Sequence, residues 1–173
     1  MRKVSEKVQL EAAEKLVSSL NKMDGVESSV DVRTNGTQNR PIVNASVSPE
    51  NWGKVAKQLK EKHLVDHCSM ITGIHWPESS DKKWEVIYHF LRTGIRDPVI
   101  EDGLVIPNIV DFSKVKGKDV PLEIQISIKI GDTRTPSVPS VQNLWVGADW
   151  NEKETWDLVG IDCLLYTSDA ADE

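Results

Sequence analysis

Hydrophobic residues recur at every fourth position near the start of the chain, in the stretch from Val4 to Met23. The apolar positions are Val8, Ala12, Leu16 and Leu20, and Glu and Lys residues are among those between them. This spacing places the apolar side chains along one face of a helix. The pattern therefore predicts an amphipathic helix, and Gly25 supplies a stop after it.

Two strand-like runs follow, and a second helix comes after them. Val26, Ser28, Val30 and Val32 occupy alternate positions, and a second run extends from Pro41 to Val47, with Asn35-Gly36 between the two. This arrangement predicts a β-hairpin whose loop is longer than the tightest turn. Ser48-Pro49 is typical of a helix start, and the apolar residues that share a face after it are Trp52, Val55, Ala56 and Leu59.

The second half of the chain has the pattern of a sheet. We expect a strand from Cys68 to Trp76, and a central strand from Trp84 to Arg92, which is apolar on both faces. From Leu122 to Ile130 apolar residues alternate with polar ones, which predicts a half-buried strand. Proline and glycine punctuate residues 93–121, and this is typical of a surface insertion such as an added hairpin.

The predicted order of elements is helix, two strands, helix, then three strands, with a short helix near the end. This order favours a two-layer α+β fold in which the helices cover one face of a mixed β-sheet. The chain has 173 residues, of which 39% are hydrophobic, so it can bury one ordinary core. We therefore expect a single domain over residues 1–161.

The charge and the hydrophobic pattern of the chain disfavour some classes of binding partner. The chain has 21 basic and 27 acidic residues, and its net charge of −6 disfavours non-specific binding to nucleic acid or to anionic lipid. Its longest apolar runs fall short of the roughly 18 residues that span a bilayer, so we expect no direct membrane insertion. The N-terminus lacks an apolar signal core, which favours a cytosolic location.

The residues that carry chemistry do not form a recognisable site. Cys68 and Cys163 lie far apart and the chain has no CxxC pair, which disfavours a cluster or a zinc site. His63 and His67 have helical spacing, but they straddle a predicted helix end and no third ligand is apparent. The chain also lacks a glycine-rich phosphate loop and a GxSxG nucleophile elbow. We therefore expect no catalytic residue, no metal and no cofactor.

The stretch from Pro136 to Ile161 concentrates aromatic residues and holds three of the six tryptophans. Tryptophan buries a large apolar area at low entropic cost, so such density suits a packed anchor or a docking surface. Asp149 or Asn151 can cap a helix here, and Asn151 with Glu154 has the spacing of a capping box. Gly160 is expected to end that helix after about two turns.

Several ordered motifs in this half of the chain resemble a known family. They are Pro139-Ser140-Val141, Trp145, Ala148-Asp149-Trp150, Glu152-Lys153-Glu154, Asp157 and Gly160-Ile161, preceded by Met70 to Glu78 and by Glu85 to Leu91. In these motifs the chain resembles the C subunit, the thirty-kilodalton subunit, of NADH-quinone oxidoreductase, which is respiratory complex I. The resemblance covers most of the chain from Ser48 to Ile161.

The chain departs from the family pattern in three places. Lys153 stands where the family has arginine, so the charge stays but the planar fork is lost. His75-Trp76 replaces the family's Asp-Tyr. After Ile161 the family continues through a Gly-His-Pro loop and a basic run, which residues 162–173 do not match, and we expect these residues to be a non-native or truncated tail.

The resemblance implies a non-catalytic subunit in the peripheral arm of an NADH (or related reduced-cofactor):quinone oxidoreductase, at the cytoplasmic face of a prokaryotic membrane. It implies docking on the D subunit and on other peripheral-arm subunits of complex I, near the quinone site. The partner-facing residues that we expect are Trp145, Trp150, Glu152, Lys153, Glu154, Trp156 and Asp157. The simpler interpretation is that these tryptophans fill the chain's own core and that the charges form a solvated helix turn.

Other functions fit the same residues. Within the family, the matching subunit of a membrane-bound hydrogenase or of a deazaflavin-dependent dehydrogenase is a close alternative. From a different class, the alternatives are a stand-alone α+β binding module and an enzyme with an unrecognised site.

Overall fold

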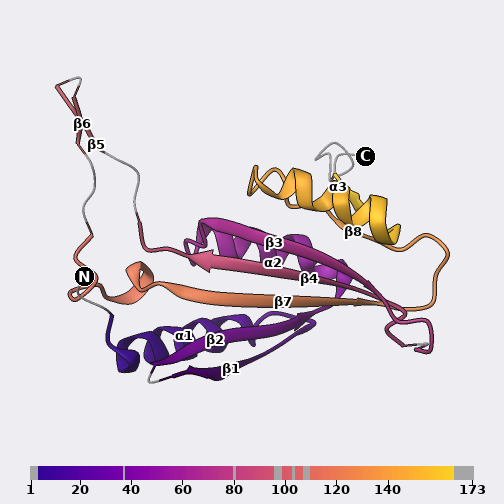
Figure 1. The fold of residues 1–173 in the computed structure, drawn as a ribbon, viewed down its shortest axis with the longest axis horizontal. Helices are drawn as coiled ribbons and strands as arrows, with labels where there is room; N and C mark the ends of the chain where they lie inside the picture. The colour runs from indigo at the N-terminus through magenta and orange to yellow at the C-terminus, as the bar shows by residue number, and fades with distance from the viewer. Residues whose placement is uncertain are drawn as a thin grey trace.

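A five-stranded mixed β-sheet forms the centre of the protein (Figure 1). The structure, a computed structural model, describes residues 4–36, 38–79, 81–95, 99–102, 104–106 and 110–165. The strands of this sheet are β1 (Val26–Asn35), β2 (Gln38–Val47), β3 (His67–His75), β4 (Trp84–Arg92) and β7 (Leu122–Ile130). Their spatial order is β1-β2-β7-β4-β3, with β2 and β7 parallel and every other neighbouring pair antiparallel.

Three helices pack on this sheet: α1 (Glu6–Leu20), α2 (Pro49–Glu61) and α3 (Ala148–Val159). Helix α1 lies on β1 and β2, α2 contacts β2 and β7, and α3 lies on β3. Their buried residues join those of the strands in one hydrophobic cluster, in which the ring of Trp52 lies 4.6 Å from that of Tyr88. The predicted α+β fold, with helices on a mixed sheet, is therefore confirmed.

Strand β7 occupies the middle of the sheet, and its burial follows the alternating pattern of its sequence. All five of its apolar residues from Leu122 to Ile130 are buried, whereas the residues between them are half-buried or exposed. The alternate side chains face opposite sides of the sheet, so one face packs on the helices. Strand β4 lies inside the sheet between β7 and β3, as its apolar sequence predicts.

The predicted insertion contains a short hairpin of β5 (Val99–Glu101) and β6 (Leu104–Ile106), followed by the 3₁₀ turn η1 (Gly117–Asp119). Figure 1 shows this hairpin projecting away from the sheet. Gly103 and Pro107, two of the residues that suggested the insertion, lie outside the described residues. The buried Arg92 links the last residue of β4 to the end of the insertion, because its Nε donates to the Val120 carbonyl oxygen at 2.8 Å.

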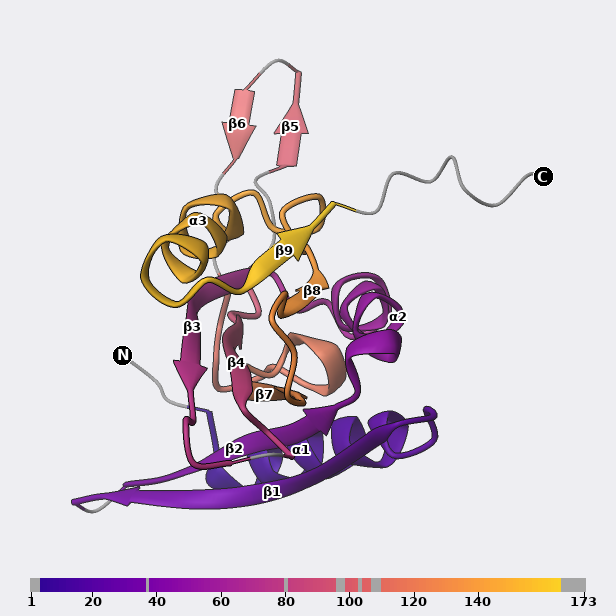
Figure 2. The same cartoon turned by 90° about the vertical axis from the view of Figure 1, so that its right-hand side faces the viewer.

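A separate two-stranded parallel sheet joins the segments before and after α3. Strand β8 (Ser137–Pro139) precedes the helix and β9 (Asp162–Leu164) follows it, and the two lie side by side (Figure 2). Residues 162–164, which were expected to begin a non-native or truncated tail, form β9 and pair with β8. The remainder of that tail from residue 166 onward lies outside the described residues.

Candidate docking surface

Helix α3 begins before both of the predicted cap residues, Asp149 and Asn151. Its first residue is Ala148, its N-cap is Gly147, and none of the described side chains caps it. Asn151 lies inside the helix, where its Nδ2 donates to the Gly147 carbonyl oxygen at 3.2 Å. The predicted capping box of Asn151 and Glu154 is therefore wrong. Gly160 ends the helix as expected, with a φ of 81° that favours glycine, after three turns and not two.

One face of α3 packs closely on β3. Ala148, Glu152 and Thr155 are buried on this face, and Val159 is half-buried. The strand contributes Gly73 at the point of closest approach, where an added Cβ atom would lie 2.8 Å from the Thr155 Cγ2 atom. Only a residue without a side chain allows the helix to come this near, so Gly73 fixes the position of α3.

Glu152 points into the protein. Its carboxylate accepts hydrogen bonds from the Ser140 hydroxyl at 2.6 Å and from the Val141 N–H at 2.7 Å. The residue is 5% exposed, and burial raises the pKa of its carboxyl above the ordinary value. Glu152 therefore joins α3 to the segment after β8. The expectation that it faces a partner does not agree with this position.

Trp145 is also an internal residue. It is 4% exposed, its ring centroid lies 4.5 Å from that of Phe90, and its Nε1 donates to the Val65 carbonyl oxygen at 3.0 Å. A tryptophan with its polar atom bonded and its ring packed is an anchor of the core. Of the two interpretations of this residue, burial in the chain's own core is the one that the geometry supports.

The opposite face of α3 is exposed to solvent and carries large apolar residues. Trp150 is 80% exposed, Trp156 is 54% exposed and Leu158 is 75% exposed. Lys153 lies on this face, with its Nζ 2.7 Å from the Asp149 carboxylate and 5.8 Å from the centroid of the Trp150 ring. We call this surface, defined by residues 149, 150, 153, 154 and 156–158, the outer face of α3.

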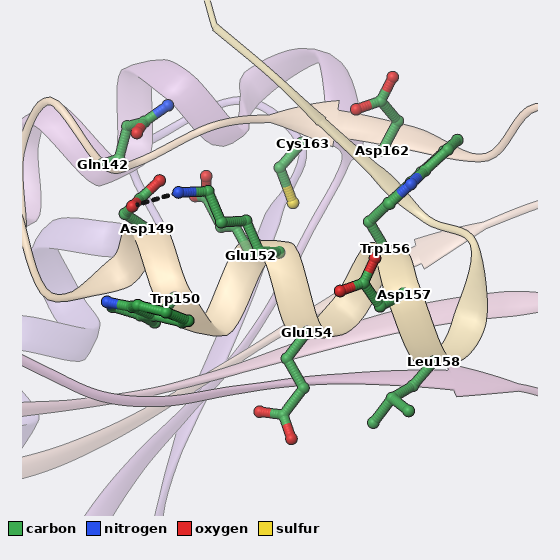
Figure 3. A pocket seen from close by; sticks show the side chains of 11 residues that line it. Gln142, Asp149, Trp150, Glu152, Glu154, Trp156, Asp157, Leu158, Asp162 and Cys163 are labelled. Atoms are coloured by element: carbon green, nitrogen blue, oxygen red, sulfur yellow. Dashed lines mark hydrogen bonds and ion pairs between the residues drawn. The ribbon is translucent and has the colours of Figure 1, made fainter.

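An open groove with a volume of about 940 Å³ runs along the outer face and continues to β9 (Figure 3). Its lining brings together six of the seven predicted residues, which are Trp150, Glu152, Lys153, Glu154, Trp156 and Asp157. Trp145 does not line it. Leu158, Asp162 and Cys163 also line the groove and were not predicted from the sequence. The helical position of Leu158, four residues after Glu154, was the signal available for it.

The cysteines and histidines form no evident reactive centre in the described part of the chain. Burial raises the pKa of Cys68 and of Cys163 to about 12, which keeps both thiols protonated. Burial, together with nearby positive charge from Lys118, lowers the pKa of His63. Within the described ranges, no group of three or more metal-ligating side chains is arranged to hold an ion.

The comparisons with known proteins agree with the order of motifs around this surface. Residues 45–164 match the family described as respiratory-chain NADH dehydrogenase, 30 Kd subunit. The chain belongs to this family. The match extends from the end of β2 to the end of β9, so it includes α3 and the groove.

Curated relatives of the 30 kDa subunit family match part of their length. The C subunit of NADH-quinone oxidoreductase from Hydrogenovibrio crunogenus is 30% identical over 122 residues, which are 66% of this chain and 55% of that protein. The corresponding protein of Rhizobium rhizogenes is 30% identical over 69% of this chain and 46% of that protein. The chloroplast J subunit of NAD(P)H-quinone oxidoreductase from Liriodendron tulipifera is 33% identical over 58% of this chain and 70% of that protein. The chain thus spans about half the length of the bacterial relatives.

A solved structure supports the fold. The trypsin-resistant fragment of Nqo5 has a TM-score of 0.52, with 16% sequence identity, and the match covers 90% of this chain and 95% of that one. At this identity the likeness concerns the fold alone. Among the helices that the structure describes, none is long and apolar enough to cross a bilayer.

Proposed function

We propose that this chain is a non-catalytic subunit of the peripheral arm of an NADH (or related reduced-cofactor):quinone oxidoreductase, and that it supports assembly by docking on the D subunit. Membership in the 30 kDa subunit family supports this proposal. The names of the relatives, which are subunits of quinone oxidoreductases, support it further. A position at the cytoplasmic face of the membrane, near the quinone site, belongs to the same proposal.

The observation that carries the proposal is the exposed apolar surface on a firmly held helix. Trp150 and Trp156 are mostly exposed, although burying so large an aromatic side chain is favourable. Truncating a tryptophan at the centre of an interface often costs about 2 kcal/mol or more of binding free energy. The charges of Lys153, Glu154 and Asp157 around these rings can fix the register of a partner.

The fold explains how the outer face of α3 is presented. Glu152 holds the helix to the segment after β8, and Gly73 lets it pack closely on β3. A surface held on both sides needs little ordering when a partner binds, so more of the contact free energy remains as affinity. This preorganisation is what a chain without chemistry of its own can contribute to an assembly.

The test is to co-express the chain with a homologous D subunit and to measure how much of that protein the affinity-tagged chain retains. Trp150→Ala, Trp156→Ala, Glu154→Ala and Asp157→Ala should each weaken retention while leaving the free energy of unfolding within about 0.5 kcal/mol of the wild type. Val32→Ala is the matched control, since Val32 is 51% exposed on β1 at the opposite edge of the sheet. Failure of the wild-type chain to retain the D subunit would refute the proposal.

A further inference from the structure

The groove on the outer face of α3 has an unbalanced charge. Five carboxylates line it, and Lys153 is the one basic residue among the described residues of its lining. Two of the carboxylates are occupied: Glu152 binds Ser140 and Val141, and Asp149 binds Lys153.

The other three carboxylates are Glu154, Asp157 and Asp162, and all three residues are exposed. Within the residues that the structure describes, none of them makes an ion pair or a side-chain hydrogen bond. The groove therefore has a surplus of negative charge available to a partner.

The exposed indole rings in this groove are suited to a cation as well. Lys153 already lies over the ring of Trp150, at 5.8 Å from its centroid. Among the described residues, no cation lies over the ring of Trp156. Figure 3 shows the Trp156 side chain extending from α3 toward Asp162 on β9, with Asp157 beside it on the helix. An aromatic face with carboxylates on either side attracts a flat cation by stacking and by charge together.

We propose that the groove between α3 and β9 receives a basic, arginine-bearing segment of the partner protein. This inference rests on the proposed function and adds the chemistry of the partner's contact surface. The guanidinium group of arginine is planar, so it stacks on the Trp156 ring while its N–H groups pair with the carboxylates of Asp157 and Asp162. A lysine ammonium cannot stack in this way and holds its water more strongly. The apolar side chains of the same segment cover Trp150 and Leu158.

Charge also favours a basic partner segment over the other possible occupants of the groove. A second copy of this chain would bring its own acidic groove, and the net charge of −6 on each copy adds repulsion. An anionic membrane surface and a nucleic acid carry the same sign as the groove. An acidic segment of a partner would leave the three carboxylates opposed by like charge, which costs binding free energy.

The first arm of the test uses synthetic dodecapeptides as probes, with repeating Arg-Leu-Gly, Lys-Leu-Gly or Glu-Leu-Gly sequences. Binding to the full chain is followed by tryptophan fluorescence at low salt. The Arg-Leu-Gly peptide should bind, and the Lys-Leu-Gly peptide should bind several-fold more weakly. The triple variant Glu154→Gln/Asp157→Asn/Asp162→Asn should weaken binding of the Arg-Leu-Gly peptide about tenfold, because three exposed pairs of a few-fold each multiply. Trp156→Ala should reduce the preference for arginine over lysine.

The control is a second triple variant that removes the same amount of charge elsewhere. Glu11→Gln/Glu14→Gln/Asp24→Asn changes three exposed acidic residues on α1 and the turn after it, and it should leave peptide binding unchanged. Equal weakening by both triple variants would show that net charge and not the groove attracts the peptide. Equal binding of the Glu-Leu-Gly and Arg-Leu-Gly peptides would also overturn the inference.

In the second arm, retention of the D subunit is measured with the same variants. This measurement separates the two proposals. If Trp150→Ala lowers retention and the triple groove variant does not, docking on α3 stands and the basic occupant is refuted. If the wild-type chain retains none of the D subunit, the proposed function fails whatever the peptides show. If retention falls about tenfold or more in the triple groove variant, and added salt weakens retention by the wild type, both proposals are supported.

Discussion

The substitution Gly73→Ala tests whether the packing of α3 on β3 is as close as the structure shows. Alanine in place of a strand glycine normally stabilises a protein by about 0.5–1 kcal/mol, because the unfolded chain loses freedom. At this position the new Cβ would lie 2.8 Å from Thr155 Cγ2 and 3.2 Å from Val159 Cγ2. Overpacking of this kind costs about 1–3 kcal/mol, so the net expectation is a loss of about 1–2 kcal/mol.

Urea unfolding followed by tryptophan fluorescence measures this loss. With a denaturant slope of about 2 kcal/mol per molar, the midpoint should fall by about 0.5–1 M. The matched control is Gly53→Ala in α2, where an added Cβ would come no nearer than 3.9 Å, to Pro139 Cβ, among the described residues. That substitution should stabilise the protein by up to about 1 kcal/mol, because alanine is the better helix former.

A second substitution identifies the clash itself. Thr155→Ser removes the Cγ2 atom and keeps the hydroxyl group, which donates to the Asn151 carbonyl oxygen at 2.8 Å. In the Thr155→Ser background the cost of Gly73→Ala should therefore fall by about 1 kcal/mol, a coupling typical of residues in contact. An equal loss of unfolding free energy on Gly73→Ala in both backgrounds, or a gain in the wild-type chain, would refute a clash between these residues.

Three further predictions concern the residues around α3. Trp145→Ala should lower the free energy of unfolding by about 3–5 kcal/mol, whereas Trp150→Ala should lower it by less than about 0.5 kcal/mol, because the first ring is buried and the second is exposed. Chemical unfolding measures both losses, and similar losses would contradict this difference in burial. Burial raises the pKa of Glu152 in the folded state, so its stabilising effect is complete below the unfolded pKa and is lost as pH rises through the folded pKa. The free energy of unfolding of the wild type, relative to that of Glu152→Gln, should therefore fall as pH rises above about 4, the ordinary pKa range of a Glu carboxyl. Unfolding curves at several pH values measure this difference. A difference that does not change with pH would show that burial does not control the pKa of Glu152. Because the pKa values of Cys68 and Cys163 are raised to about 12, both thiols should react with a disulfide reagent at pH 8 much more slowly in the native protein than in urea. Rapid reaction of the native protein would contradict these raised pKa values.

Long periodic elements could be predicted from sequence alone because their patterns repeat. The alternation from Leu122 to Ile130 extends over nine residues, and the stripe of α1 continues for several turns, so each pattern has few alternative explanations. Strands β8 and β9 have three residues each, which is too short for a period to be visible. The motifs shared with the family also end at Ile161, so the role of residues 162–164 could not be inferred.

The exposed residues around α3 could be predicted only in part, because sequence does not tell which tryptophans meet the core. Trp145 and Trp150 are five positions apart and equally apolar, yet the first bonds to Val65 and the second is exposed. Backbone turns precede α3, where the N–H groups of Leu144 and Trp145 both donate to the Val141 carbonyl oxygen. These turns lead directly into the helix, since the Ala148 N–H donates to the Trp145 carbonyl oxygen at 2.8 Å.

The central position of β7 has a consequence for how the chain folds. Its neighbours β2 and β4 belong to two hairpins that are formed earlier in the sequence, and only β7 joins them. Before residues 122–130 leave the ribosome, each hairpin has an inner edge of unpaired N–H and C=O groups beside buried apolar positions. Closing the sheet then requires β2 to meet a strand about 80 residues later in the chain, a loop closure that slows folding. Pairing of these open edges with other chains is therefore a hazard during synthesis, and it ends when β7 is in place.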